Sequence, residues 1–217
     1  MKKLIILIIV LALIIGGGYY AYNKGYVNKW FPWLPQAEKK DKDGNRIFSD
    51  AEIKQYNQYM QEAHDFMTKG DAGQPDFYKQ AVSDYQKASA IGNDKFWNPL
   101  LGLAEAYRKL HDFNNADLAF NKALQAANFG EGQIYQEKID MYRNDMKKSS
   151  DEIKAVYNEA IQKVMDNANL VLAYATYLRD IGDYKDALTY YEAILKKFPT
   201  NQLYIKEIAN LKAKIGK

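Results

Sequence analysis

A small or aliphatic residue followed four positions later by an aromatic ring recurs along this chain at a nearly constant interval. The aromatic rings are 35, 37 and 34 residues apart. Each ring is followed after three positions by another small or aliphatic residue, so every segment presents one apolar stripe with helical spacing. A period in this range predicts a stack of helical hairpins, in which these segments are the second helices. The four pairs are Ala81 and Tyr85, Ala116 and Phe120, Ile153 and Tyr157, and Ala187 and Tyr191.

An amphipathic segment also precedes these helices and is predicted to be the first helix of each hairpin. The clearest is PLLGLAEAYRKL, whose apolar face is formed by Leu100, Leu103, Ala104 and Tyr107. The small side chain of Ala104 lets the two helices of a hairpin approach closely. Tight turns are expected after the first helices. In the second unit His111 stands where Gly182 stands in the fourth, and we expect it to adopt a positive φ, which histidine tolerates better than most residues.

These spacings resemble the tetratricopeptide repeat (TPR) family, whose signature combines a Leu-Gly or Leu-Ala pair, a Tyr, an Ala-x-x-x-Phe/Tyr step and a final Pro. The resemblance covers residues 49–201 and is strongest in the second and fourth units. The first unit has an insertion near 72–76, and the third lacks a Gly-Asp turn and has Ile153 in place of Ala. The resemblance implies an all-α solenoid with a capping helix at 202–217. Its units are expected at about 49–93, 94–130, 131–167 and 168–201.

The N-terminus predicts a membrane anchor. Lys2 and Lys3 precede 19 uncharged residues, Leu4 to Tyr22, close to the roughly 20 that span the hydrocarbon core of a bilayer. Residues 1–23 are therefore predicted to be a single transmembrane signal-anchor helix, followed at 24–48 by a juxtamembrane stalk of aromatic and then charged residues. A cleaved signal peptide is the alternative. The short basic N-terminus is expected to stay cytoplasmic, which places the repeats outside the cytoplasm.

Charge and composition argue against nucleic-acid binding and catalysis. The net charge of +3 is local, because the first 40 residues carry six lysines against one glutamate and the remainder sums to −2. A nucleic-acid binder would display Lys and Arg on its folded part. The sequence has no cysteine, only two histidines (His64 and His111), and no zinc motif or phosphate loop. We predict a protein that is not an enzyme and uses no cofactor.

One stretch, DKDGNRIFSDAE, has the ligand spacing of a calcium loop. Against calcium, Arg46 occupies the position at which that loop needs Gly for its sharp turn. Glu52 is explained equally well by a helix-capping box with Ser49, and Ser150 is expected to cap a later helix. The candidate calcium ligands are Asp41, Asp43, Asn45, Ser49 and Glu52.

The TPR resemblance implies a scaffold whose inner groove, lined by the first helices, binds an extended or helical segment of another protein. The family's carboxylate clamp of Lys and Asn is not reproduced. The membrane-anchored plan is similar to bacterial envelope proteins with TPRs, so a role in envelope assembly or protein translocation is expected. The alternative is a self-associating structural or spacer protein, suggested by Tyr177 and Tyr190 on outer faces. The candidate groove residues are Asn98, Leu101, Glu105, Arg108, Asn169, Leu172, Thr176 and Arg179.

Overall fold

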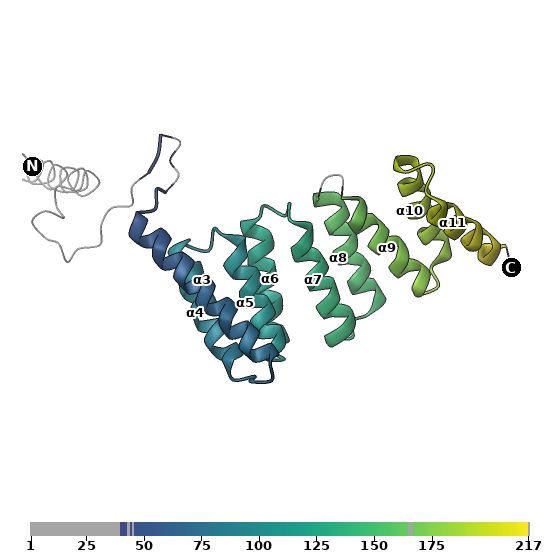
Figure 1. Cartoon of the computed structure of the whole chain (residues 1–217). Helices are drawn as coiled ribbons and strands as arrows, with labels where there is room; N and C mark the ends of the chain where they lie inside the picture. The colour runs from purple at the N-terminus through teal and green to yellow at the C-terminus, as the bar shows by residue number, and fades with distance from the viewer. Residues whose placement is uncertain (1–39, 43, 45, 165–166, 217) are drawn as a thin grey trace, which may run out of the picture. The chain divides into compact units, whose positions relative to one another are not determined.

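The predicted all-α fold class is confirmed over the residues that the structure describes. A computed structural model describes residues 40–42, 44, 46–164 and 167–216. Apart from one isolated bridge between Lys40 and Arg46, all regular secondary structure in these residues is helical (Figure 1). The chain divides into two compact units, Met1–Lys54 and Gln55–Lys217. The second unit contains every helix after α3 and most of α3 itself.

The predicted transmembrane helix, residues 1–23, lies outside the described residues, as does most of the predicted stalk at 24–48. Within the described part of the chain, no helix is long and apolar enough to cross a membrane. The membrane anchor, the cleavage alternative and the topology therefore stay predictions.

The helices pack on their neighbours in chain order, as expected of stacked hairpins. Helix α5 packs on α4 and α6, and α10 packs on α9 and α11. The first and second helices of the four hairpins are α3 and α4, α5 and α6, α7 and α8, and α9 and α10. The elements are α3 (Asp50–Asp71), α4 (Phe77–Ile91), α5 (Trp97–Lys109), α6 (Phe113–Ala126), α7 (Gly132–Asp140), the π-helix η1 (Met141–Asp145), α8 (Ser150–Lys163), α9 (Ala168–Asp180), α10 (Tyr184–Lys197) and α11 (Gln202–Ile215).

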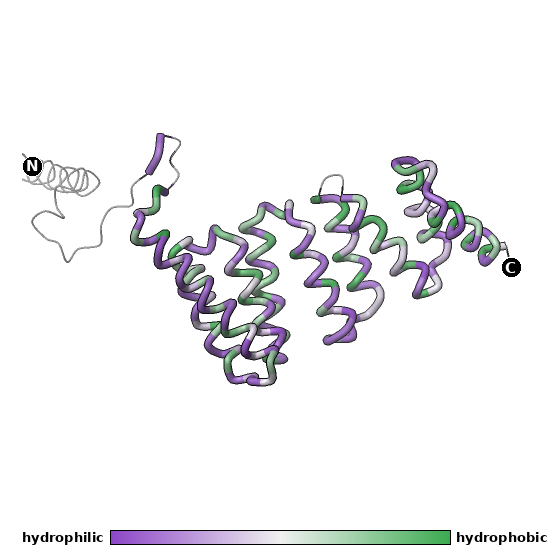
Figure 2. Tube along the Cα trace, in the orientation of Figure 1, coloured by the Kyte–Doolittle hydropathy of each residue, from purple (hydrophilic) through white to green (hydrophobic). Residues whose placement is uncertain are grey.

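The residues of the periodic pattern form the core. Their small side chains are fully buried, which allows the helices of a hairpin to approach closely. Along each helix the chain alternates between hydrophobic and hydrophilic residues (Figure 2), as an amphipathic helix with one buried face requires. Gly102 on α5 lies directly against the ring of Tyr85 on α4, so that a side chain at this position would meet the ring. In the described part of the chain, the alanines with 0% exposure are Ala63, Ala81, Ala88, Ala104, Ala106, Ala116, Ala123, Ala160, Ala175 and Ala187.

The turns of the second and fourth hairpins have the same geometry. His111 has φ +58° and Gly182 has φ +84°, which confirms the positive φ expected for His111. The amide of His111 donates to the carbonyl of Arg108 at 3.0 Å, and the amide of Gly182 donates to that of Arg179 at 3.1 Å. The amide of the following aspartate then bonds a carbonyl five residues back in each turn, which satisfies the last carbonyls of the first helix.

The third hairpin departs from this plan, in line with its poor match to the repeat signature. Its first helix, α7, has only nine residues and continues directly into η1. The amide of Met146 donates to the carbonyl of Met141, five residues back, at 3.0 Å. Near this point the buried residues also separate into two hydrophobic clusters, with Tyr142 and Val156 packed against both.

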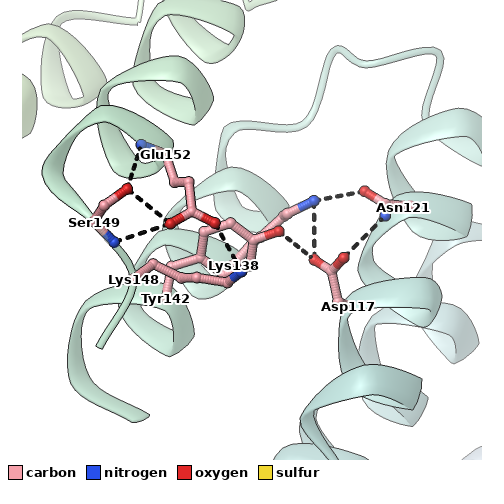
Figure 3. Close-up of polar contacts among 7 residues, drawn as sticks. All are labelled: Asp117, Asn121, Lys138, Tyr142, Lys148, Ser149 and Glu152. Atoms are coloured by element: carbon pink, nitrogen blue, oxygen red, sulfur yellow. Dashed lines mark hydrogen bonds and ion pairs between the residues drawn. The ribbon is translucent and has the colours of Figure 1, made fainter. Parts of the chain in front are cut away.

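A polar network joins the second and third hairpins (Figure 3). Lys138 on α7 is only 8% exposed, and its Nζ donates to Oδ1 of Asn121 on α6 at 2.6 Å. The same Nζ lies 3.0 Å from Oδ1 of Asp117, which also accepts from the hydroxyl of Tyr142 at 2.9 Å. Because every buried charge in this network has a partner, the desolvation cost of Lys138 is offset.

Two helix N-termini carry capping boxes. The predicted box of Ser49 and Glu52 is confirmed, since the Ser49 amide donates to Glu52 Oε2 at 2.8 Å and the Glu52 amide donates to Ser49 Oγ at 3.3 Å. The prediction that Ser150 caps a helix is wrong by one residue. Ser149 is the N-cap of α8 and pairs with Glu152 in the same reciprocal way, because only Ser149 has a glutamate three residues later.

Candidate partner-binding groove

A cavity of about 670 Å³ opens along the first helices of the first three hairpins. Helix α3 contributes residues of its last two turns, α5 contributes its C-terminal turns, and α7 and η1 close the far side. One aromatic ring, Tyr85, comes from the second helix α4. The lining residues are His64, Met67, Thr68, Asp71, Tyr85, Glu105, Arg108, Lys109, His111, Glu137 and Asp145.

Helix periodicity explains why these side chains face the same space. On α5, Glu105 and Arg108 are one turn apart and therefore lie on one face. The two alanines next to Glu105 in the sequence, Ala104 and Ala106, are fully buried and do not line the cavity. The same spacing on α3 places His64, Thr68 and Asp71 one above the other. The core faces of the helices thus fix the direction of the cavity residues.

One edge of the cavity is an ion pair between the first two hairpins. Lys109 Nζ donates to Asp71 Oδ1 at 2.6 Å, and the Tyr78 hydroxyl donates to the same oxygen at 2.8 Å. The hydrogen bond from Lys109, followed by that from Tyr78, lowers the pKa of the Asp71 carboxyl. The hydrogen bond to Asp71 raises the pKa of Lys109. Both groups therefore stay charged and paired around neutral pH.

Arg108 makes a second bridge, from α5 to the third hairpin. Its Nε donates to Asp145 Oδ2 at 2.5 Å, and its Nη1 lies 3.6 Å from Glu137 Oε2. In the fourth hairpin Arg179 on α9 makes a similar contact, with its Nη1 3.5 Å from Oε1 of Glu207 on α11, the helix that follows the last hairpin. Each arginine thus connects the first helix of its hairpin to the structure that follows that hairpin.

Glu105 differs from every other carboxylate of the cavity. It forms no side-chain hydrogen bond and no ion pair with any residue that the structure describes. Burial, and next the nearby charge of Glu137, raise the pKa of the Glu105 carboxyl. Burial also raises the pKa of Tyr85 to about 12, with a further contribution from the charge of Glu105. A half-buried carboxylate without a partner is therefore present in the wall of the cavity.

The predicted groove residues of the second unit fall into three environments. Glu105 and Arg108 line the cavity. Asn98 is exposed in the first turn of α5. Leu101 is 5% exposed and belongs to the hydrophobic core. Leu101 and Asn98 do not line the cavity, so Glu105 and Arg108 are the predicted residues of this unit that a partner in the cavity would meet.

The fourth unit places its predicted residues on α9, outside this cavity. Asn169 is exposed and Leu172 is half-buried against the second hydrophobic cluster. The Thr176 hydroxyl lies 3.1 Å from that of Tyr191, and Arg179 also donates to Asp180 at 2.8 Å. A binding role for these four residues stays a prediction.

Several cavity residues were not among the predicted set, because residues were carried over only from the two units that match the repeat signature well. His64, Thr68 and Asp71 come from the first unit, and Glu137 and Asp145 come from the third. The spacing of polar residues on α3 was a usable signal. The position of Asp145 depends on η1, for which the repeat pattern gives no indication.

The predicted calcium site is not tested as a set, since Asp43 and Asn45 lie outside the described residues. Of the others, Glu52 is engaged by Ser49 and also accepts from Arg46 Nη2 at 2.5 Å. Over the described parts of the chain, no three His, Cys, Asp or Glu side chains gather in a way that could hold a metal ion.

The two tyrosines predicted to lie on outer faces pack within the fourth hairpin and its neighbour. Tyr177 is only 5% exposed and its ring stacks on Tyr157, with centroids 5.5 Å apart, so this prediction is wrong for Tyr177. Tyr190 is half-buried, and its ring lies 4.8 Å from that of Tyr174. Tyr177 lies where α9 packs on α8, and Tyr190 lies where α10 packs on α9, so both face other aromatic rings. They give no support to self-association.

Residues 168–211 match the family model described as tetratricopeptide repeat. The resemblance to the TPR family is confirmed for this segment. No curated protein matches the chain.

Among solved structures, the chain is similar to the MamA protein, with 17% identity over 76% of this chain and 84% of that one, and a TM-score of 0.54. It is also similar to pilF of Pseudomonas aeruginosa, with 16% identity over 76% and 71% of the two chains, and a TM-score of 0.52. At these identities the likeness shows the fold alone, a TPR-like helical solenoid.

Proposed function

We propose that this chain is a protein-interaction scaffold that binds a segment of another protein along the first helices of its repeats. The observation that carries the proposal is the cavity of about 670 Å³, to which three consecutive hairpins each contribute first-helix residues. Its lining combines two largely apolar side chains, Met67 and Tyr85, with charged residues, a mixture that is common in binding sites. A TPR-like fold supports the same conclusion, because stacked hairpins present extended concave surfaces.

We further propose that the scaffold acts as a single-pass membrane protein of the cell envelope, with its repeats outside the cytoplasm and a role in envelope assembly or protein translocation. The support is in the sequence, where 19 uncharged residues follow Lys2 and Lys3 and precede the stalk of aromatic and then charged residues. Fractionation of cells, with protease added to intact spheroplasts, tests this part separately. Resistance of the repeats to the protease would contradict the proposed topology.

Site-specific crosslinking in cells tests the groove. A photoreactive amino acid replaces Thr68, which is exposed in the cavity, and in a matched control replaces Gln162, which is exposed on the second helix α8 outside it. We expect a discrete crosslinked partner from position 68 and none from position 162. Crosslinks to a second copy of the chain from either position would favour the self-associating alternative, and equal crosslinking from both positions would refute the groove.

A further inference from the structure

The cavity holds more negative charge than its own cations neutralise. Its arginine and lysine, Arg108 and Lys109, are already ion-paired with carboxylates of neighbouring hairpins. Two histidines, His64 and His111, also line it. Glu105 has neither an ion pair nor a hydrogen bond to any residue described in the structure. Four carboxylates line the cavity against one arginine and one lysine, so two negative charges are left when the histidines are neutral, and Glu105 is the carboxylate that has no partner in the described part of the chain.

Two apolar side chains lie in the same cavity. Met67 on α3 is 8% exposed and Tyr85 on α4 is 6% exposed, so each shows only an edge to the cavity. Glu105 lines the same cavity as the Tyr85 ring. Lysine and arginine side chains match this pairing, because an aliphatic stem packs on apolar surface while the cation reaches a charged partner. An aromatic ring beside the cation adds a favourable interaction.

On the basis of the proposed function, we propose that the groove selects a protein segment that carries a lysine or arginine. The aliphatic stem of this residue would pack on Met67 and Tyr85, and its cation would pair with Glu105. An acidic segment or a chain-terminal carboxylate would meet Glu105 and Glu137 and would find the arginine and the lysine of the cavity already paired. Like charges placed together disfavour such partners. Glu105 is thus a specificity-determining residue, and the arginine and lysine beside it hold the groove in shape.

Selection from a random library of short phage-displayed peptides tests this inference without knowledge of the natural partner. The bait is the purified full-length chain in detergent micelles, as wild type, as Glu105→Gln and as Glu131→Gln. Glutamine keeps the shape of the side chain and removes the charge. Glu131 is exposed at the N-cap of α7 and makes no side-chain cap hydrogen bond, so its variant removes the same charge outside the cavity.

Wild type and Glu131→Gln are expected to enrich peptides with a lysine or arginine at a fixed position. Glu105→Gln is expected to lose this enrichment and to bind the selected peptides about tenfold more weakly, which corresponds to one charge-assisted contact. In a selected peptide whose fixed residue is arginine, replacing this arginine with citrulline should weaken binding to wild type by a similar factor. The same replacement should leave binding to Glu105→Gln unchanged.

The outcomes separate the inference from the function on which it rests. Peptides that crosslink to position 68 without preference for a cation, or with an equal preference in Glu105→Gln, would overturn the inference and leave the groove standing. Peptides that crosslink only outside the cavity, or a library from which nothing is selected, would overturn both. Because Glu105 has no partner to lose, Glu105→Gln should melt no lower than wild type, and a lower melting temperature would instead indicate a structural role for Glu105.

Discussion

Replacing Gly102 with alanine should destabilise the repeat domain, although alanine is the better helix former. A Cβ built at Gly102 would lie 2.5 Å from Cε1 and 2.9 Å from Cε2 of Tyr85, and closer still to Cζ. Ordinary van der Waals contact begins near 3.4 Å. The Tyr85 ring, only 6% exposed, would therefore have to move by roughly an ångström against packed neighbours.

The size of the effect follows from two opposing terms. Overpacking a well-packed site costs about 1–3 kcal/mol, and the gain in helix propensity from Gly to Ala is about 1 kcal/mol. We expect a net loss of about 1–2 kcal/mol for Gly102→Ala. In a Tyr85→Leu background the ring is gone, so Gly102→Ala should change sign and stabilise the chain by up to about 1 kcal/mol.

Urea denaturation followed by far-ultraviolet circular dichroism measures all four members of this cycle. Gly130→Ala is the matched control, because the nearest atom to its Cβ, the Ala127 carbonyl oxygen, lies at an ordinary 3.5 Å. Its effect should stay within about 0.5 kcal/mol. If Gly102→Ala leaves stability unchanged, or is equally harmful with Leu at position 85, the close packing of α4 on α5 is not what requires glycine here.

Three further perturbations test other parts of the structure. Lys138→Met should cost about 1–3 kcal/mol in urea titrations because Asp117 loses a charged partner, and adding Asp117→Asn should restore part of the loss. Hydrogen bonds from Lys148 and Ser149 lower the pKa of Glu152 from 4.5 to about 2, so the stability they give is present above pH 4.5 and is lost as the pH falls towards 2. Thermal melts of Glu152→Gln should therefore depend less on pH over that window than those of wild type. Leu101→Ala should cost about 2–5 kcal/mol by urea titration, as for a core leucine, whereas a loss below about 1 kcal/mol would indicate a side chain free to contact a partner.

The sequence was sufficient to locate the hairpins, because each depends on a local pattern. An alanine four residues before an aromatic ring lies on the same helix face as the ring, and the alanines of this pattern are buried. The turn at His111 was also accessible, since its position relative to the neighbouring helices matches that of Gly182. The N-cap at Ser149 could have been found from Glu152, three residues later, but the adjacent Ser150 obscured it.

The charge state of the cavity could not be predicted in the same way. Within the described residues, Glu105 is left without a partner because Arg108, one turn away, pairs with Asp145 instead. Asp145 belongs to the π-helix into which α7 continues. Such contacts join residues that lie far apart in the sequence and belong to different units. The repeat pattern specifies backbone positions and core faces, and it leaves the pairing of polar residues open.

Hydrogen–deuterium exchange of the full-length chain, with and without the partner captured by crosslinking at position 68, tests the central claim most directly. The account predicts that the partner slows exchange in the C-terminal half of α3, in α5 and in α7 with η1, and leaves α6 and α8, which do not line the cavity, unchanged. Slower exchange confined to the second helices, or spread evenly over the repeats, would contradict the claim that the first helices form the binding surface.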